Sequence, residues 1–513
     1  MPGSGIDTAV PATGRAAGRA AAGPAATGRA AAGRAAAGRA ATGGIVAACV
    51  LVAGVPATAV GAAGAGLAPP TSAASPLTHA LGTWPAAGAR PVVAGRFTPA
   101  VRTSPQAMPA GAPHGVGSVV FDCQKSSAGN RTCYGPQQLR AAYRIQPLLD
   151  RGITGAGRTI VIVDAYAPPG IDKDLHEFDR AYGLPDPQLR IVAPQGAVWD
   201  GRDPNQQAWA SEIDIDVQWT HAIAPEAEIV LVEAKSESDP DLAAAVRYAV
   251  RHRLGDVISQ SFGEDERCTP PDVRTELSDT YRAAAAAGIT VVASSGDTGA
   301  GQYVCDPKSA DLRSGATFPA SDPRVLAVGG TQLTADLSSG AYGSETAWND
   351  GGSSYPAASG GGYSTVFDRP GYQAGAVDRR ARGLPDVSYS SASQGAVMVY
   401  WGQDGTGGRF YGFFGTSVAT AQWSGLVALA AQLARHRLGL LHPTIYRAAL
   451  GNCGNAVFHD IRTGDNTVHY RDDAGVARTV AGYRAGPGWD AVTGVGSPIA
   501  TGLVPLLAGA GRR

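Results

Sequence analysis

Regular alternation of β-branched apolar runs with helix-like stretches is the feature that most constrains how this chain folds. The apolar runs cover residues 159–163, 190–192, 228–232, 257–259 and 290–293. The stretches between them, at 172–182, 205–221, 239–254 and 275–287, are typical of helices, with Asp239 as the predicted cap of the third and Gly288 closing the fourth. We therefore predict an α/β domain with a mainly parallel sheet, helices on both of its faces and right-handed crossovers.

Polar residues stand just past the ends of three predicted strands, at Asp164, Ser261 and Asp297. Ligands of parallel sheets bind at the carboxyl ends of the strands, so a site is expected there, with Asp164 in a structural or supporting role. Residues 339–409 contain many glycines and are predicted to be rich in loops, and residues 450–500 are predicted to carry short elements.

Gly415-Thr416-Ser417 precedes a run of small and apolar residues that continues to Leu433. This order predicts a tight turn into a buried helix, with Ser417 near the helix N-terminus. Unpaired N–H groups and the helix dipole favour developing negative charge at such a position, as a serine nucleophile requires. The alternative is that Thr416 or Ser417 only caps the helix.

Two carboxyl groups, Glu212 and Asp216, lie four residues apart on the predicted 205–221 helix and share one face, whereas Asp214 points elsewhere. If they are buried, such a pair shares a proton and titrates as a unit, which provides a base at low pH. Apolar neighbours such as Trp209 and Trp219 favour burial, and the alternative is a solvated acidic face.

A third carboxyl group, Asp297, follows the strand 290–293 through Ser-Ser-Gly, where the alternative is a plain Asx turn. None of the nine histidines stands in a His-Gly-Thr context, so a serine enzyme on this chain needs a carboxylate base. An α/β-hydrolase is not expected, because Val418 and Ala419 follow Ser417 where that fold requires a Gly-x-Ser-x-Gly elbow.

Over roughly residues 135–505 the chain resembles the sedolisins, the serine-carboxyl peptidases with a subtilisin-like fold. The resemblance rests on the order and spacing of several motifs, namely 155–166, the Glu212 and Asp216 pair, Ala224-Pro225, 261–263, 295–297 and 415–417.

The resemblance implies a role for each of these site residues. Ser417 is the expected nucleophile, Glu212 the general base, and Asp216 the group that holds Glu212 and shares its proton. Asp297 would donate to the oxyanion while protonated, which implies activity at acidic pH. Ser261 and Gly263 are expected on the strand that pairs with the substrate backbone.

A calcium site is expected near the C-terminus, where Asp460-Ile461 and Gly486-Pro487-Gly488-Trp489-Asp490 bring carboxylates and glycine carbonyls together. An all-oxygen cage suits calcium. In the sedolisin pattern the ligands of one structural ion are the side chains of Asp460 and Asp490 and the backbone oxygens of Ile461, Gly486 and Gly488.

The chain departs from the family pattern at Phe414, where serine is usual, and at Ala421, where proline is usual. Sedolisins also carry a large folded propiece, and residues 69–122 are too short and too poor in apolar periodicity to form one. These departures support the alternative of a catalytically inactive, peptide-binding member of the same fold. Endopeptidase and tripeptidyl-peptidase activities both fit the resemblance.

Three segments are predicted along the chain. Residues 1–68 are a low-complexity leader and signal peptide, 69–122 a Pro/Ala/Gly-rich linker, and 123–513 the peptidase domain. The apolar stretch 45–60 could instead be a permanent anchor, and the true start could lie further along the chain. Secretion is expected, with membrane attachment only if this stretch remains uncleaved.

Of the six cysteines, Cys123 with Cys133 and Cys268 with Cys305 are plausible disulfides in an exported protein, and free thiols are the alternative. Zinc is not expected, because no CxxC pair exists. The net charge of -1 gives no indication of a nucleic-acid partner. We expect a monomer that acts on peptides or proteins.

Overall fold

The central sheet has eight strands, in the order β14-β13-β9-β7-β4-β6-β5, with β17 also paired to β13. These strands are β4 Thr159–Ala165, β5 Gln188–Val192, β6 Glu228–Ala234, β7 Val257–Gln260, β9 Thr290–Ser294, β13 Val325–Ala335, β14 Tyr342–Ala347 and β17 Val387–Ser390. All neighbouring pairs are parallel except β13 with β14. The computed structural model describes residues 98–99, 102–104, 121–125, 132–196, 198–306, 309–351, 356–403, 407–451 and 454–510.

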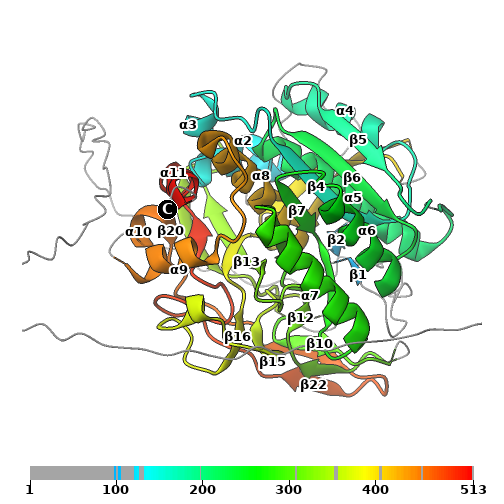
Figure 1. Ribbon diagram of the computed structural model, residues 1–513, viewed down its shortest axis with the longest axis vertical. Helices are drawn as coiled ribbons and strands as arrows, with labels where there is room; N and C mark the ends of the chain where they lie inside the picture. The colour runs from blue at the N-terminus through cyan, green and yellow to red at the C-terminus, as the bar shows by residue number, and fades with distance from the viewer. Residues whose placement is uncertain are drawn as a thin grey trace, which may run out of the picture. The chain divides into compact units, whose positions relative to one another are not determined.

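Helices cover both faces of this sheet, as predicted (Figure 1). On one face lie α6 Asp239–Arg251 and α7 Pro271–Ala286, and on the other α4 Ile171–Tyr182, α5 Pro204–Ile223, α8 Thr416–Ala434 and α11 Ala500–Ala510. Side chains of β4 alternate between the two layers, because successive residues of a strand point to opposite faces. Val161 and Val163 join the core under α6 and α7, while Ile160 joins the core under α8.

Smaller sheets flank the central one. The strands β2 Arg102–Ser104, β19 Arg409–Phe414, β18 Ala396–Trp401 and β3 Cys133–Tyr134 form one sheet in that order, and β1 Thr98–Pro99, β8 Phe262–Asp265 and β12 Thr317–Phe318 form another. Four antiparallel pairs complete the set: β10 Gly301–Tyr303 with β11 Leu312–Ser314, β15 Gly362–Asp368 with β16 Ala381–Leu384, β20 Phe458–His459 with β23 Ser497–Pro498, and β21 Val468–Arg471 with β22 Ala477–Val480.

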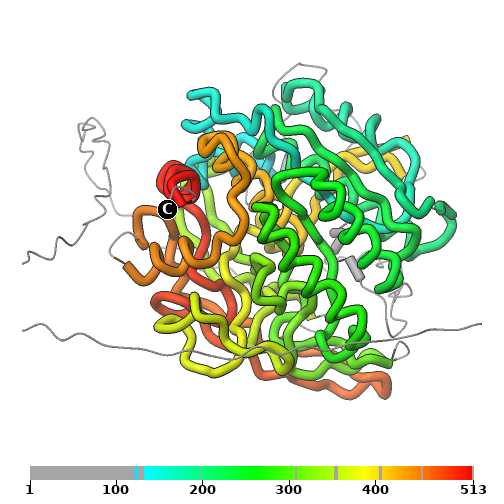
Figure 2. Tube along the Cα trace, in the orientation of Figure 1, coloured from blue at the N-terminus to red at the C-terminus, as the bar shows by residue number. Residues whose placement is uncertain are grey.

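Short helices connect these parts of the structure. They are α1 Asp122–Lys125, α2 Pro136–Ala142, α3 Gln146–Leu149, the 3-10 helix Gly371–Gln373, α9 His442–Leu450 and α10 Gly454–Val457. Figure 2 shows that early elements, in cyan, lie beside the red C-terminal helix, and the backbone N–H of Ala500 donates to the carbonyl of Tyr143 at 2.9 Å.

Two predictions about secondary structure were wrong, those for the start of α7 and for the cap of α6. The segment 339–409, predicted to be rich in loops, also contains β14 to β18 and the first residue of β19. α7 starts at Pro271 rather than at residue 275, because proline is favoured in the first turn of a helix. The N-cap of α6 is Ser238, so Asp239 is instead the first helical residue.

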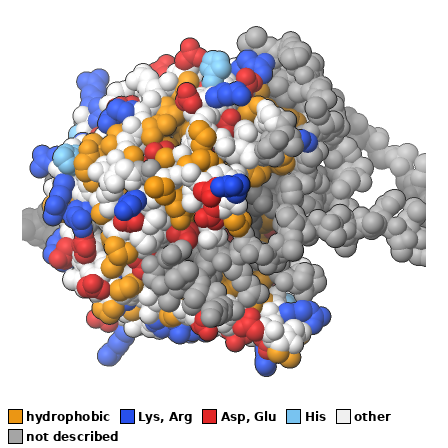
Figure 3. Space-filling view, turned by 90° about the vertical axis from the view of Figure 1, so that its right-hand side faces the viewer, with side chains coloured by type: hydrophobic (Ala, Val, Ile, Leu, Met, Phe, Trp, Pro, Cys, Tyr) orange, Lys and Arg blue, Asp and Glu red, His pale blue; other side chains and the backbone are white. Residues whose placement is uncertain are grey.

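Two disulfides join Cys123 to Cys133 and Cys268 to Cys305, which confirms both predicted pairs. Cys49 and Cys453, like the predicted leader, the 45–60 stretch and most of the predicted linker, lie outside the described residues. Within the part of the chain that is described, no helix is both long and apolar enough to cross a membrane. On the face seen in Figure 3, acidic and basic side chains are interspersed with apolar ones.

Candidate active site

The packing of α5 against α8 brings two distant parts of the chain together. The hydroxyl of Thr220 on α5 donates to the carbonyl of Ala421 on α8 at 3.2 Å. Both helices are buried along most of their length, α5 from Trp209 onward. The solvated acidic face considered for α5 is therefore excluded. Ala421, where the family pattern has proline, is one of the buried residues of an uninterrupted helix.

Ser417 is the second residue of α8 and is fully buried. The turn before it depends on Gly415, which has a φ of 136° that side-chain-bearing residues rarely adopt. Gly415 is also the N-cap, so neither Thr416 nor Ser417 caps the helix. The Ser417 hydroxyl lies 3.4 Å from the backbone oxygen of Ser261, at the end of a helix whose free N–H groups favour negative charge.

Glu212 and Asp216 are both completely buried on the same face of α5. Burial raises the pKa of Glu212 well above its usual value, the charges of Asp216 and Asp164 raise it further, and the Ser417 hydroxyl partly opposes them. Burial also raises the pKa of Asp216 to about 8, with the Ser261 hydroxyl opposing. The coupled pair therefore retains a shared proton that two solvent-exposed carboxyl groups would have lost.

Asp164 extends this cluster from β4, where it is the next-to-last residue rather than lying past the strand end as predicted. Burial first, and then the charges of Asp216 and Glu233, raise the pKa of Asp164 well above its usual value. Asp214 faces away from the cluster, as expected, and its Oδ1 accepts from Gln218 at 3.1 Å.

Asp297 follows β9 and reaches the start of α8. Its Oδ1 accepts from both the backbone N–H and the hydroxyl of Thr416, each at 2.8 Å. The Thr416 hydroxyl in turn accepts from the N–H of Gly296 at 3.2 Å. Asp297 is therefore fixed one residue from Ser417, and its contacts are not those of a plain Asx turn.

Ser261 connects two members of the site, which sequence analysis did not predict. Its hydroxyl donates to Asp216 Oδ1 at 2.8 Å, while its backbone oxygen lies against the Ser417 hydroxyl. The relevant contacts span 45 and 156 residues, so no local pattern could have indicated them. Its position past the end of a predicted strand and the family motif 261–263 indicated a site residue, but not these two contacts.

Gly263, two residues further on, lies in β8. A Cβ there would come within 2.4 Å of Thr317 Cγ2 and 2.8 Å of the Phe318 carbonyl oxygen, so β12 packs too closely for any other residue. Gly263 thus lies on the strand that begins directly after Ser261, the residue in contact with Ser417.

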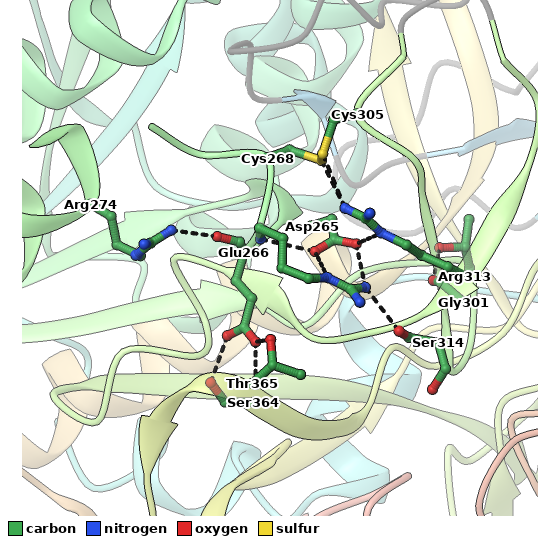
Figure 4. Close-up of polar contacts among 12 residues, drawn as sticks. Asp265, Glu266, Cys268, Arg274, Gly301, Cys305, Arg313, Ser314, Ser364 and Thr365 are labelled. Carbon is green, nitrogen blue, oxygen red and sulfur yellow. Dashed lines mark hydrogen bonds and ion pairs between the residues drawn. A yellow bond between two sulfur atoms is a disulfide. The ribbon is translucent and has the colours of Figure 1, made fainter. Parts of the chain in front are cut away.

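The end of β8 is anchored by the polar network drawn in Figure 4. Asp265 accepts from Arg267 at 2.6 and 2.8 Å and from Arg313 at 2.8 Å. Glu266, which is buried, accepts from Ser364 Oγ at 2.6 Å and from Thr365 Oγ1 at 2.8 Å. These contacts hold the end of β8 in place, and no local sequence pattern predicts them.

Two segments that carry the expected calcium ligands, 460–461 and 486–490, contact each other near the C-terminus. Asp460 Oδ1 accepts from the N–H of Gly488 at 3.0 Å, and Asp490 Oδ2 from the N–H of Gly486 at 3.1 Å. Asp460 also pairs with Arg462 at 2.7 Å. In the described residues no three side chains of His, Cys, Asp or Glu form a metal-binding group, but the expected set needs only two carboxylates and three backbone oxygens. This donor chemistry fits a hard cation.

Comparisons with known proteins identify the family. The model of the subtilase family matches residues 205–475. Kumamolisin from Bacillus sp. (strain MN-32) is 32% identical over 407 residues, which cover 75% of this chain and 66% of kumamolisin. Sedolisin from Pseudomonas sp. (strain 101) is 31% identical, covering 67% of this chain and 57% of sedolisin.

A solved structure, Pseudomonas sedolisin (serine-carboxyl proteinase) complexed with two molecules of pseudo-iodotyrostatin, is also similar. It has a TM-score of 0.62 and 28% identity, covering 74% of this chain and 99% of that chain. The chain spans between 57% and 66% of the length of the two curated relatives. It belongs to the subtilase family and, within it, to the sedolisins.

Proposed function

We propose that the chain is a serine-carboxyl peptidase that hydrolyses peptide bonds at acidic pH through Ser417, Glu212 and Asp216, with Asp297 as oxyanion donor. One observation carries the proposal: the hydroxyl of a buried serine at a helix N-terminus lies 3.4 Å from the backbone oxygen of Ser261, whose own hydroxyl donates to Asp216 of a buried acid cluster at 2.8 Å. The similarity to Pseudomonas sedolisin, a serine-carboxyl proteinase, supports the same reaction class.

In this mechanism Glu212 takes the Ser417 proton as the hydroxyl attacks the substrate carbonyl carbon. Asp216 holds Glu212 and shares its proton, and Ser261 fixes Asp216 through the 2.8 Å hydrogen bond. Since Thr416 donates to Oδ1 of Asp297, the proton of the neutral acid belongs on Oδ2, from which it is donated to the oxyanion. Ionisation of Asp297 abolishes that donor, so activity is lost as the pH rises.

Substrate recognition is assigned to β8, with Gly263 pairing with an extended peptide by strand addition. One calcium ion would be held by Asp460, Asp490 and the backbone oxygens of Ile461, Gly486 and Gly488. The ion would hold the two segments together by coordination and would take no part in the reaction. The two disulfides support secretion, because such bonds persist in oxidising compartments. We propose a monomer that acts on peptides or proteins.

The test is hydrolysis of an unstructured protein from about pH 3 to pH 8, a range in which carboxyl groups titrate. Ser417→Ala and Glu212→Ala are compared with wild type and with Asp214→Asn. The last variant is the matched control, because Asp214 is a buried acid on the same helix that faces away from Ser417. Activity confined to acid, lost in the first two variants and kept in Asp214→Asn, is expected. Unchanged cleavage by Ser417→Ala would refute the proposal.

The second candidate is an inactive peptide-binding member of the family. It is favoured by Phe414 and Ala421 and by the pairing of β1 with β8, which indicates that this edge accepts an extended segment. It predicts peptide binding without turnover, so any hydrolysis that depends on Ser417 excludes it.

A further inference from the structure

A pocket of about 460 Å³ lies between α2, the start of α3 and the C-terminal end of α4. Its wall is partly apolar, with Pro136, Ala141 and Leu184 among the lining residues. Two polar side chains that also line it, Arg140 and Tyr182, have only 9% and 7% of their surface exposed. None of the residues assigned above to catalysis, substrate or calcium, all of them within the described ranges, lines this pocket. The proposed mechanism therefore does not explain it.

Arg140 brings a buried positive charge to the pocket. Its Nε donates to the carbonyl oxygen of Ala222 at 2.6 Å, which fixes the guanidinium against the last turn of α5. Its Nη2 is buried and has no hydrogen-bond partner among the described residues. Because an unpaired buried donor costs free energy, such a group in a folded protein is expected to bind water, an ion or a ligand.

The hydroxyl of Tyr182 is a second buried polar group on this pocket. Tyr182 is the last residue of α4, and its ring packs against Phe178 and Phe410, with centroids 4.8 and 5.9 Å away. The hydroxyl oxygen is buried, and in the described part of the chain it too has no hydrogen-bond partner. Aromatic contacts thus position the ring and leave the hydroxyl available to donate to a ligand.

The charge of Arg140 is not balanced by a neighbouring acid at acidic pH. Asp179 is the acid whose charge acts on Arg140, yet neither of its oxygens accepts a hydrogen bond from a described residue, and its ion-pair contact is with His221 at 3.3 Å. Burial raises the pKa of Asp179 to about 8, and lowers the pKa of His221 to about 4 and that of Arg140 to about 10. At about pH 5 Arg140 is therefore charged, while Asp179 and His221 are neutral.

The pocket is accessible and larger than one water molecule requires. Gln137 and Gln146, which also line it, are exposed, so a ligand can enter from solvent. A water molecule occupies about 30 Å³, far less than the pocket offers. A buried guanidinium beside a hydroxyl donor suits an oxyanion, and guanidinium groups match carboxylates in geometry as well as in charge. The apolar part of the wall favours a ligand with a hydrocarbon portion.

We propose that this pocket binds the carboxylate of a small apolar acid, with Arg140 Nη2 and the Tyr182 hydroxyl as donors to the carboxylate and with the hydrocarbon portion against Ala141 and Leu184. A free organic acid and the C-terminal carboxylate of a peptide share this chemistry. Because such a ligand binds only the folded chain, it should also raise the midpoint of thermal unfolding. The inference is independent of the proposed peptidase activity, since the pocket contains none of the residues assigned to it.

The experiment measures binding to the full chain by calorimetry at about pH 5, where carboxylate ligands are mostly ionised. Isovalerate represents a free organic acid and N-acetylleucine the C-terminus of a peptide, and each is compared with its neutral amide at constant ionic strength. Wild type is compared with Arg140→Gln and Tyr182→Phe. Arg151→Gln is the matched control, because Arg151 is an exposed arginine just beyond α3.

We expect wild type and Arg151→Gln to bind at least one of the two acids with a dissociation constant on the order of 1 mM, as suits a small ligand with few contacts. The corresponding amide should bind at least about tenfold more weakly, because it lacks the charge that strengthens hydrogen bonds to a guanidinium. Whichever acid binds more tightly identifies the source of the carboxylate.

Arg140→Gln should weaken binding at least about tenfold, and Tyr182→Phe, which removes one hydroxyl and keeps the ring, about three- to tenfold. If Arg140→Gln fails to fold, Tyr182→Phe and the amides still decide. No binding of either acid by wild type, equal binding of acid and amide, or an affinity unchanged by either substitution would overturn the inference. Each of these results would leave the proposed function standing.

Discussion

Two groups of buried carboxylates differ in what surrounds them. Glu212, Asp216 and Asp164 face one another, and no cation contributes to the shifts of their pKa values, which are raised by burial. Asp265 and Asp386 are equally buried, but arginines contact both. Burial raises their pKa values as well, yet the contacts with arginine outweigh burial and lower them. In these two acids the contacts with arginine, joined at Asp386 by His442, set the direction of the pKa shift.

This difference gives the two groups opposite effects on stability as the pH changes. Acids whose pKa is raised in the folded state keep a proton there that they lose on unfolding. They therefore destabilise the fold increasingly as the pH rises above the unfolded pKa of about 4. Acids with lowered pKa values stabilise the fold above about pH 4, and this stabilisation is lost as the pH falls through their folded pKa values.

The largest effect is expected from removing the arginine of the deepest pair. Arg382 contacts Asp386 at 2.7 and 2.5 Å, and both side chains are fully buried. Arg382→Met leaves a buried, uncompensated carboxylate, which costs about 3–5 kcal/mol. Denaturant unfolding at neutral pH measures the loss. Arg382→Lys keeps the charge and should lose less, and equal losses would mean that charge is not what matters here.

The next largest effect is expected on catalysis, from substitution of Asp297 at the start of α8. Asp297→Ala removes the proposed oxyanion donor and the acceptor of two hydrogen bonds from Thr416, so kcat should fall by about 10²–10³-fold. Asp297→Asn keeps both an acceptor and a donor and should retain more activity. Steady-state kinetics at acidic pH measure both, and a loss confined to KM would contradict the oxyanion role.

The third prediction concerns the effect of Asp216 on the stability of the fold. Its carboxyl group has a pKa of about 8 in the folded protein and about 4 in the unfolded chain, so between these pH values only the unfolded chain has lost the proton. Asp216→Asn removes this charge and still accepts from Ser261. Its gain in stability over wild type should be absent near pH 4 and reach roughly 2–4 kcal/mol near pH 8. Thermal unfolding across pH tests this, and a constant difference would exclude the titration.

The strands β4, β6, β7 and β9 could be predicted because they are apolar runs rich in β-branched residues. The strand β13 was not predicted, because it contains Gly329 and Gly330, and glycine is typical of loops. A Cβ at Gly329 would come within 2.6 Å of Pro385, and one at Gly330 within 2.7 Å of Trp348, so close packing rather than a turn requires these glycines.

In the site, sequence order and family resemblance identified Ser417, Glu212, Asp216 and Asp297 as candidates. What they could not supply were contacts between distant segments. Asp265 and Arg313 are 48 residues apart, and Glu266 and Ser364 are 98 apart. These contacts exist only once β8, β11 and β15 have packed together, so nothing local to any of the residues predicts them.

The smallest expected effect comes from Asp265, one of the two buried acids that contact arginine. Asp265→Asn removes the charge that holds Arg267 and Arg313, and since both arginines are about one-third exposed, water replaces part of the loss. We expect a cost of about 1–3 kcal/mol near pH 6, which shrinks as the pH falls because protonated Asp265 in wild type loses the same charge.

The matched control is Asp279→Asn, whose pair with Arg282 is exposed and should contribute about 0–1 kcal/mol. Because Asp265 ends the strand assigned to substrate, KM should rise while kcat stays near wild type. If Asp265→Asn and Asp279→Asn prove equally mild, the arginines do not set the state of the buried acid, and the contrast with the active-site cluster reduces to depth alone.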